Sequence, residues 1–116
     1  MKKANLNKLQ ETCEKLGWKF SHDKKNGTIE LRKYSLAGED FGFTVSDKNP
    51  IKEILEAYCS FDIEEHVVEW LDAKRSGVSG IPDVITLVED ARDINQMFSD
   101  LRVECTKLTL EFGGWG

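Results

Sequence analysis

The chain has two histidines, His22 and His66, and histidine is the side chain best suited to acid–base chemistry near neutral pH. On a helix, His66 shares a face with Asp62, four residues earlier, and Glu69, three residues later. Such a cluster suits a divalent metal, or an imidazole that carboxylates assist in catalysis. We favour the simpler interpretation, a surface histidine on an acidic helix, because Asp62 is also well placed to cap that helix. His22 alternates with Trp18 and Phe20, so we expect it to close the apolar face of a sheet.

The three cysteines, Cys13, Cys59 and Cys105, are separated by 46 residues each, which matches no zinc or redox spacing. Each falls on the apolar stripe of an expected helix, where free cysteine behaves as a small hydrophobic residue. We therefore predict three reduced cysteines in the core and no metal ligand among them. Reduced thiols are typical of the cytosol.

Motifs that define common enzyme classes are missing from the sequence. The stretch Gly77-Val78-Ser79-Gly80 lacks the lysine of a phosphate-binding loop, and neither a Gly-x-Ser-x-Gly turn nor a His-Glu-x-x-His helix is present. We predict no catalytic residue, no metal and no cofactor. The alternative that stays open is a small metal-dependent or hydrolytic enzyme centred on His66.

The sign of the charge changes along the chain, whose net charge is −5. Residues 1–35 contain nine Lys and Arg against four Asp and Glu, whereas residues 62–100 contain three against ten. Net acidity argues against direct binding of nucleic acid, which rests on basic patches. The acids favour a protein partner with a basic surface, because oriented charge speeds and selects association. The alternative is an ordinary solvated surface. The acidic residues predicted to face the partner are Glu64, Glu65, Glu69, Asp72, Glu89, Asp90 and Asp93.

Tryptophan is enriched at the hot spots of interfaces, and the chain has three. Trp18 and Trp70 fall on expected apolar faces and are predicted to lie in the core. Trp115 is the second-last residue of the sequence and lies between glycines, and we add it to the predicted partner-binding residues. Its alternative is a tail that folds back over the sheet or moves freely.

The first half of the chain predicts one helix and three strands. Apolar residues from Leu6 to Leu16 have helical spacing, with Asn5 as the expected cap. The period changes to two at Trp18, and Asn26-Gly27 is a strong hairpin signal. The expected strands cover residues 18–23, 28–34 and 41–46, with a second turn at residues 36–40.

The second half returns to a helical period. Asn49-Pro50 marks one helix start, Asp62 with Glu65 has the spacing of a capping box, and Pro82 begins the longest helix. Residues 106–112 are ambiguous. Their alternating apolar residues suit a fourth strand, but the last helix can also continue through them.

Strands that run together and are followed by helices are typical of the α+β class. We predict a single α+β domain over residues 1–116: a three-stranded antiparallel meander, with a fourth strand left open, packed against an N-terminal helix and two to three C-terminal helices. No apolar run approaches the ~20 residues of a membrane span, and acids follow the basic start, so we expect a cytoplasmic protein and no membrane contact. A homodimer through the sheet or the longest helix also stays open.

The motif Phe61-Asp62-x-x-Glu65-His66-x-x-x-Trp70, followed by Gly80-Ile81-Pro82, resembles a family of small uncharacterised proteins. These are carried on mobile elements and phages of intestinal Gram-positive bacteria, and the similarity covers residues 38–101. The resemblance implies no activity and no catalytic residue. It does imply a setting in which small acidic proteins block host defence proteins. We therefore expect a non-enzymatic binding module, an accessory or anti-defence protein that acts through an acidic helical face.

Overall fold

The computed structural model describes residues 2–35, 38, 40–75 and 84–113. Along the chain it contains α1 (Lys3–Lys15), β1 (Lys19–Asp23), β2 (Thr28–Tyr34), β3 (Asp40–Ser46), α2 (Pro50–Ser60), α3 (Ile63–Arg75) and α4 (Val84–Phe112). The predicted α+β fold is confirmed: an N-terminal helix precedes a three-stranded antiparallel meander, and the remaining helices follow it.

The sheet has the order β1-β2-β3, with both pairs antiparallel. Phe20 lies opposite Leu31, and Leu31 lies opposite Phe43, so these three residues cross one face of the sheet. The β1–β2 turn falls at the predicted Asn-Gly pair, where Gly27 has a φ of 67° that glycine adopts without strain. Other elements must therefore pack against this apolar face of the sheet to shield it from water.

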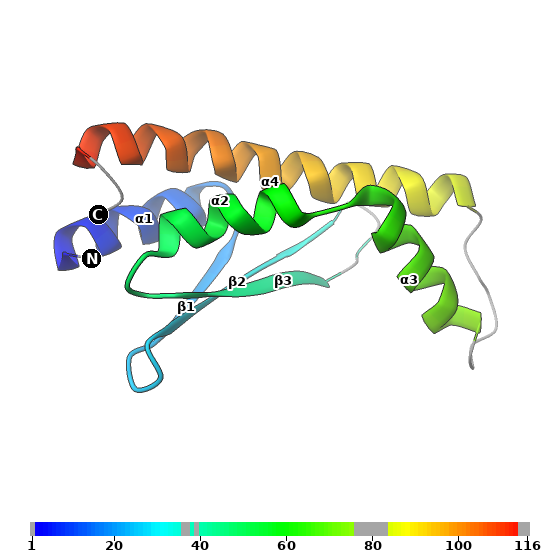
Figure 1. The fold of residues 1–116 in the computed structure, drawn as a ribbon, viewed down its shortest axis with the longest axis horizontal. Helices are drawn as coiled ribbons and strands as arrows, with labels where there is room; N and C mark the ends of the chain where they lie inside the picture. Colours follow the sequence, from blue (N-terminus) through cyan, green and yellow to red (C-terminus); the bar gives the residue numbers. More distant parts are fainter. Residues whose placement is uncertain (1, 36–37, 39, 76–83, 114–116) are drawn as a thin grey trace.

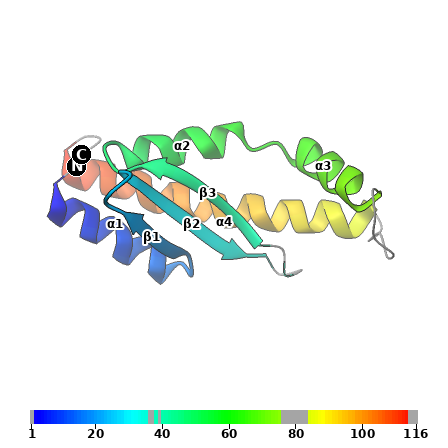
Figure 2. The same ribbon diagram turned by 90° about the horizontal axis from the view of Figure 1, so that it is seen from below.

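Helices provide that cover in a single layer. Figures 1 and 2 show α4 running the length of the molecule across the sheet, with α1 on the β1 side and α2 on the β3 side. The molecule is elongated, with extents of 48 × 28 × 22 Å. Helix α3 lies beyond the end of the sheet and packs mainly against the first part of α4.

The main core lies between the sheet and the helix layer, and Phe98 of α4 is its aromatic centre. The Phe98 ring is 4.9 Å from the ring of Phe43 and 5.4 Å from that of Phe41, between centroids, and its side chain is 2 % exposed. Trp18 is also 2 % exposed and packs edge-on against Phe43 at 5.8 Å, which confirms its predicted place in the core. The sheet and α4 are thus joined by interlocked rings.

The ends of two helices differ from the predictions. Helix α1 begins at Lys3 rather than after Asn5, and its N-cap, Lys2, makes no side-chain capping bond. The open alternative at residues 106–112 resolves as helix, since α4 continues to Phe112. Leu101, Cys105 and Leu108 are buried at helical spacing, and Phe112 packs against the same core, whereas Leu110, which fits only the alternating pattern, is 79 % exposed.

All three cysteines are free, but only two lie in the core. Cys13 and Cys105 are fully buried, as predicted, whereas Cys59 is exposed and that prediction is wrong. Cys59 follows Tyr58 at the end of α2, one position off the stripe that Ile51 and Ile54 form. Desolvation raises the pKa of Cys13 to about 12 and also raises the pKa of Cys105.

These buried thiols predict a loss of stability in alkali. An unfolded chain ionises each thiol near pH 9, and the folded chain holds Cys13 neutral up to about pH 12. The stabilising effect is complete below pH 9 and is lost between pH 9 and 12, at up to about 1.4 kcal/mol per pH unit for each thiol. Urea unfolding at several pH values measures this slope. We expect Cys13→Ala to make it shallower and Cys59→Ala to leave it unchanged; equal slopes in all three proteins contradict the assignment.

Candidate functional site

Two hollows flank the short joint between α2 and α3. The first, which we call the acidic hollow, has a volume of about 260 Å³. It is lined by Phe41, Ser60, Phe61, Asp62, Glu65, His66 and Glu69. The second has a volume of about 600 Å³ and is lined by Cys59, Ser60, Phe61, Asp62, Ile63, Glu64, Glu65 and Asn95. Carboxylates therefore dominate the polar lining on both sides of the joint.

The joint is shaped by a helix cap. Phe61 ends α2 with an extended ψ of 122°, which turns the chain away from the helix axis. The Oδ1 atom of Asp62 then accepts hydrogen bonds from the backbone N–H groups of Glu64 (2.8 Å) and Glu65 (3.2 Å). This confirms Asp62 as the cap of α3, and it fixes the first turn that carries the acids of both hollows.

Aromatic rings form the apolar wall of the acidic hollow. The Phe61 ring lies 5.7 Å from that of Phe41 and 5.5 Å from the imidazole of His66, between centroids. Phe41 and Phe61 both also contact Phe98 of the main core. The wall is therefore continuous with the main core, while the carboxylates stand at its rim.

A second, smaller core holds α3 in place. It consists of Val67, Leu87 and Ala91, with Ile63 and Val88 packed against it. We call α3 together with residues 84–91 of α4 the arm. Among the described side chains, far fewer are buried in the arm than in the main core, and so we expect the arm to be less stable than the main core.

The outer surface of the arm combines acidic and apolar residues. Glu64, Glu65 and Glu69 are exposed on α3, and Val68 among them is 54 % exposed. On α4, Ile85 is 71 % exposed and Glu89, one turn further along, is exposed as well. These four acids lie where the sequence predicts them, on the solvent side of two helices.

The prediction for Asp90 is wrong, because this side chain is buried at 3 % exposure. Ser35, which directly follows β2, donates a hydrogen bond from its hydroxyl to Oδ1 of Asp90. Asp90 lies next to Ala91 and three residues after Leu87, so the inward face of α4 carries it into the interior. Oδ2 of Asp90 has no hydrogen-bond partner in the described part of the chain. This contact joins the sheet to the arm, and the sequence offered no signal for it.

The other predicted partner-binding residues are less exposed or lie outside the described structure. Asp93 is half-buried on α4 and already interacts within the chain. The side chain of Asp72 and the whole of Trp115 lie outside the described residues, as does the side chain of Trp70. The structure thus brings together Glu64, Glu65 and Glu69 at the joint, and it adds Asp62 and the aromatic wall, which the sequence analysis did not assign to binding.

The candidate metal cluster of the sequence does not form in the described structure. No group of three His, Cys, Asp or Glu side chains among the described residues is arranged to hold a metal ion, so His66, Asp62 and Glu69 do not converge as ligands. His66 instead faces the ring of Phe61, and its backbone N–H donates to the carbonyl of Asp62 at 3.0 Å.

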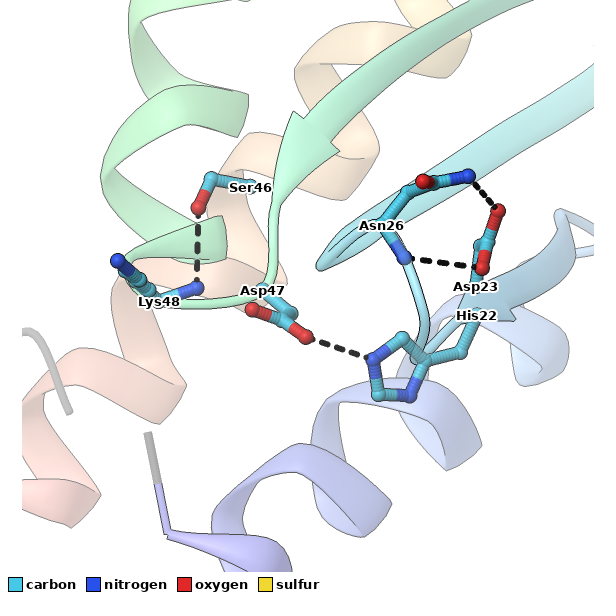
Figure 3. A network of polar contacts seen from close by, with 6 residues as sticks. All are labelled: His22, Asp23, Asn26, Ser46, Asp47 and Lys48. Atoms are coloured by element: carbon cyan, nitrogen blue, oxygen red, sulfur yellow. Dashed lines mark hydrogen bonds and ion pairs between the residues drawn. The ribbon is translucent and has the colours of Figure 1, made fainter.

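His22 occupies a different place in the molecule, at the far end of the sheet from the arm. It is half-buried on the covered face of β1, as its alternation with Trp18 and Phe20 predicts. Its Nε2 lies 3.0 Å from Oδ2 of Asp47, a residue of the loop between β3 and α2 (Figure 3). This pairing spans 25 positions of the sequence, so spacing alone did not predict it.

No protein-family model matches this chain, and no curated protein or solved structure matches it either. The resemblance to small proteins of mobile elements therefore stays a prediction. None of the helices in the described ranges combines the length and apolarity required to cross a membrane. The site must be interpreted from its own geometry.

Proposed function

We propose that this protein is a non-enzymatic, cytoplasmic protein-binding module whose acidic hollow receives a basic side chain of a partner protein. The observation that carries the proposal is the composition of this hollow. Asp62, Glu65 and Glu69 line it together with the rings of Phe41 and Phe61. Its volume of about 260 Å³ suits one extended side chain rather than a larger ligand.

The chemistry of this lining favours arginine or lysine. A guanidinium forms short, charge-assisted hydrogen bonds with carboxylates and also stacks on aromatic rings. The half-enclosed setting strengthens both interactions relative to open water. Exposed Val68 and Ile85 supply apolar contacts beside the charges, as the centre of a protein interface requires.

The wider role follows from the resemblance of the motif around Asp62 and His66 to proteins of mobile elements. In that setting we expect the partner to be a basic host protein, and the module to be an accessory or anti-defence protein that occupies its surface. Carboxylates on the arm then take the place of nucleic-acid phosphates on that partner. The chain itself is not expected to bind nucleic acid, because the exposed charged side chains that the structure describes on the arm are acidic.

Affinity capture from host cells, followed by mass spectrometry, tests the proposal with two variants of equal charge. Glu65→Gln/Glu69→Gln removes two charges from the acidic hollow, and Glu11→Gln/Glu14→Gln removes two from the exposed face of α1. We expect the first variant to capture at least tenfold less partner than the wild type, and the second variant to capture as much as the wild type. Equal capture by both variants, or no specific partner for the wild type, contradicts the proposal.

The alternative of a hydrolytic enzyme centred on His66 rests on one observation, that His66 lines the same hollow as three carboxylates. The variant His66→Gln separates the two functions. Binding through the carboxylates survives this change within a few fold, whereas a hydrolytic activity that uses the imidazole is abolished. A partner that the wild type cleaves and the variant only binds establishes the alternative.

A further inference from the structure

The backbone of β3 is paired on one side only, because β3 is an edge strand of the sheet. The Asp47 N–H points toward the β1–β2 hairpin, where it donates to a carbonyl at 2.9 Å. The preceding N–H, that of Ser46, points away from β2 and donates to Oε1 of Glu53 in α2 at 3.0 Å. Backbone groups alternate in direction along an antiparallel strand. The N–H and carbonyl groups of Thr44 and Gly42 therefore also point away from β2.

These outward groups are open to a further strand. Within the described part of the chain, nothing hydrogen-bonds to the outward N–H or carbonyl groups of Gly42 and Thr44. Thr44 is exposed and Gly42 is half-buried. We call the outward backbone groups of these two residues the β3 edge. A row of free groups on an edge strand is a template for the addition of another strand.

Strand β3 lacks the features that usually protect an edge strand from pairing. After Asp40 it contains no charged residue and no proline. Its register with β2 is continuous over the whole strand, so no bulge twists the edge away. The other edge strand, β1, is shorter and has a charged residue at each end, Lys19 and Asp23. The β3 edge is therefore the better site for strand addition.

The β3 edge leads directly into the acidic hollow. Phe41 belongs to β3 and also lines that hollow. Helix α2 runs back along β3 and is followed by Phe61, whose ring contacts that of Phe41 (Figure 2). Opposed residues of neighbouring strands share a face of the sheet. On an added strand, the residue opposite Phe41 therefore projects on the face where the aromatic wall and the carboxylates lie.

We propose that the β3 edge receives an extended segment of the partner protein as a fourth strand, and that this segment places its basic side chain in the acidic hollow. The inference rests on the proposed function and adds the conformation and the sequence pattern of the partner. The segment pairs with the backbone of Gly42 and Thr44. Its residue opposite Phe41 is arginine or lysine. Its residue opposite Phe43 is apolar, because it extends the apolar row across the covered face.

A peptide titration followed by backbone amide NMR shifts of the full chain tests the proposal. The probe is acetylated and amidated Thr-Val-Thr-Arg-Thr, which in an antiparallel strand sets its valine opposite Phe43 and its arginine opposite Phe41. N-methylation of the first and third residues removes the N–H groups that face β3, and we expect binding to weaken at least tenfold. N-methylation of the valine and the arginine removes N–H groups that point away, and we expect a change of less than threefold.

Variants of the chain test the same pairing from the other side. Thr44→Pro removes an outward N–H without removing a bond to β2, and edge strands tolerate proline at such positions. We expect this variant to bind the peptide at least tenfold more weakly. Thr44→Val keeps the N–H and is expected to bind within threefold of the wild type. The methylated peptides give their result on the wild-type chain, so the test stands even where Thr44→Pro does not fold.

The outcomes separate the strand pairing from the acidic hollow. Equal binding of the two methylated peptides, or shifts that never saturate, overturns the fourth strand. If Glu65→Gln/Glu69→Gln still weakens partner capture in that case, the proposed function survives. A peptide with glutamine in place of arginine that binds as tightly as the original contradicts the role of the hollow and the placement of the basic side chain.

A second copy of this chain is the other candidate to occupy the β3 edge. Light scattering of the wild type and of Thr44→Pro decides between the two. We expect both proteins to be monomers. A dimer of the wild type that Thr44→Pro dissolves, and that excess peptide leaves intact, assigns the β3 edge to self-association and overturns the proposal.

Discussion

Replacing Phe98 with alanine is expected to cost about 3–5 kcal/mol of unfolding free energy, the usual loss for truncating a buried phenylalanine. Phe98 is 2 % exposed, and its ring contacts those of Trp18, Phe41, Phe43, Tyr58 and Phe61. The substitution removes the ring that joins the sheet to α4, and the flat neighbouring rings cannot close the cavity. The total free energy of unfolding of a domain is about 5–15 kcal/mol, so a large share of the stability depends on this one side chain.

Urea unfolding followed by circular dichroism measures the loss, with Leu110→Ala as the control on the same helix. Leu110 is 79 % exposed, so its truncation is expected to change the unfolding free energy by less than about 0.5 kcal/mol. A Phe98→Ala protein within 1 kcal/mol of the wild type would show that the aromatic cluster does not hold the sheet to the helices.

Replacing Leu87 with alanine is expected to open the arm while the sheet stays folded. Leu87 is fully buried, and among the described side chains its small core consists of Val67, Leu87 and Ala91, with Ile63 and Val88 packed against it. We expect the substitution to destabilise the packing of α3 by about 2–5 kcal/mol, because α3 packs mainly against this part of α4. Amide hydrogen exchange in α3 should therefore quicken by roughly 30-fold or more, the equivalent of about 2 kcal/mol.

The exchange rates of β1 and β2 provide the internal reference for this variant, and Ile85→Ala provides the external one. Ile85 is 71 % exposed on the same turn of α4, so its truncation should leave the exchange of α3 nearly unchanged. If exchange quickens equally in α3 and in the sheet after Leu87→Ala, the arm and the main core unfold as one unit, and the description of two cores is wrong. The variant is also expected to lose the partner, since the acidic hollow needs α3 in place.

Local sequence patterns predicted the elements of this fold well, because the signals are strong and short-range. The Asn26-Gly27 pair defined the hairpin, Pro50 the start of α2, and Asp62 the cap of α3. Each of these signals depends only on residues close together in the sequence, so it can be recognised from the sequence alone. Residues 106–112 were the exception, since Leu108 and Phe112 satisfy both periods, and their contact with the main core selects the helix and leaves Leu110 exposed.

The candidate sites were harder to predict, because they depend on contacts between distant residues. Acidity alone placed Asp90 with the exposed acids, yet its hydroxyl donor, Ser35, lies 55 positions away. The burial of Cys59 was also predicted wrongly, because a shift of one position along a helix moves a side chain from the core-facing side to the solvent side. The acidic hollow combines Phe41 of β3 with Glu69 of α3, and no spacing rule relates those two residues.

The affinity of the captured partner at rising salt concentration tests the central claim most directly. An acidic hollow that holds a basic side chain predicts a dissociation constant that rises at least tenfold between about 50 and 500 mM salt, because salt screens exposed charges. The Glu65→Gln/Glu69→Gln variant should bind the partner more weakly at low salt, and its dissociation constant should change little as the salt concentration rises. A wild-type affinity that stays constant over this range would contradict the claim that these carboxylates bind the partner.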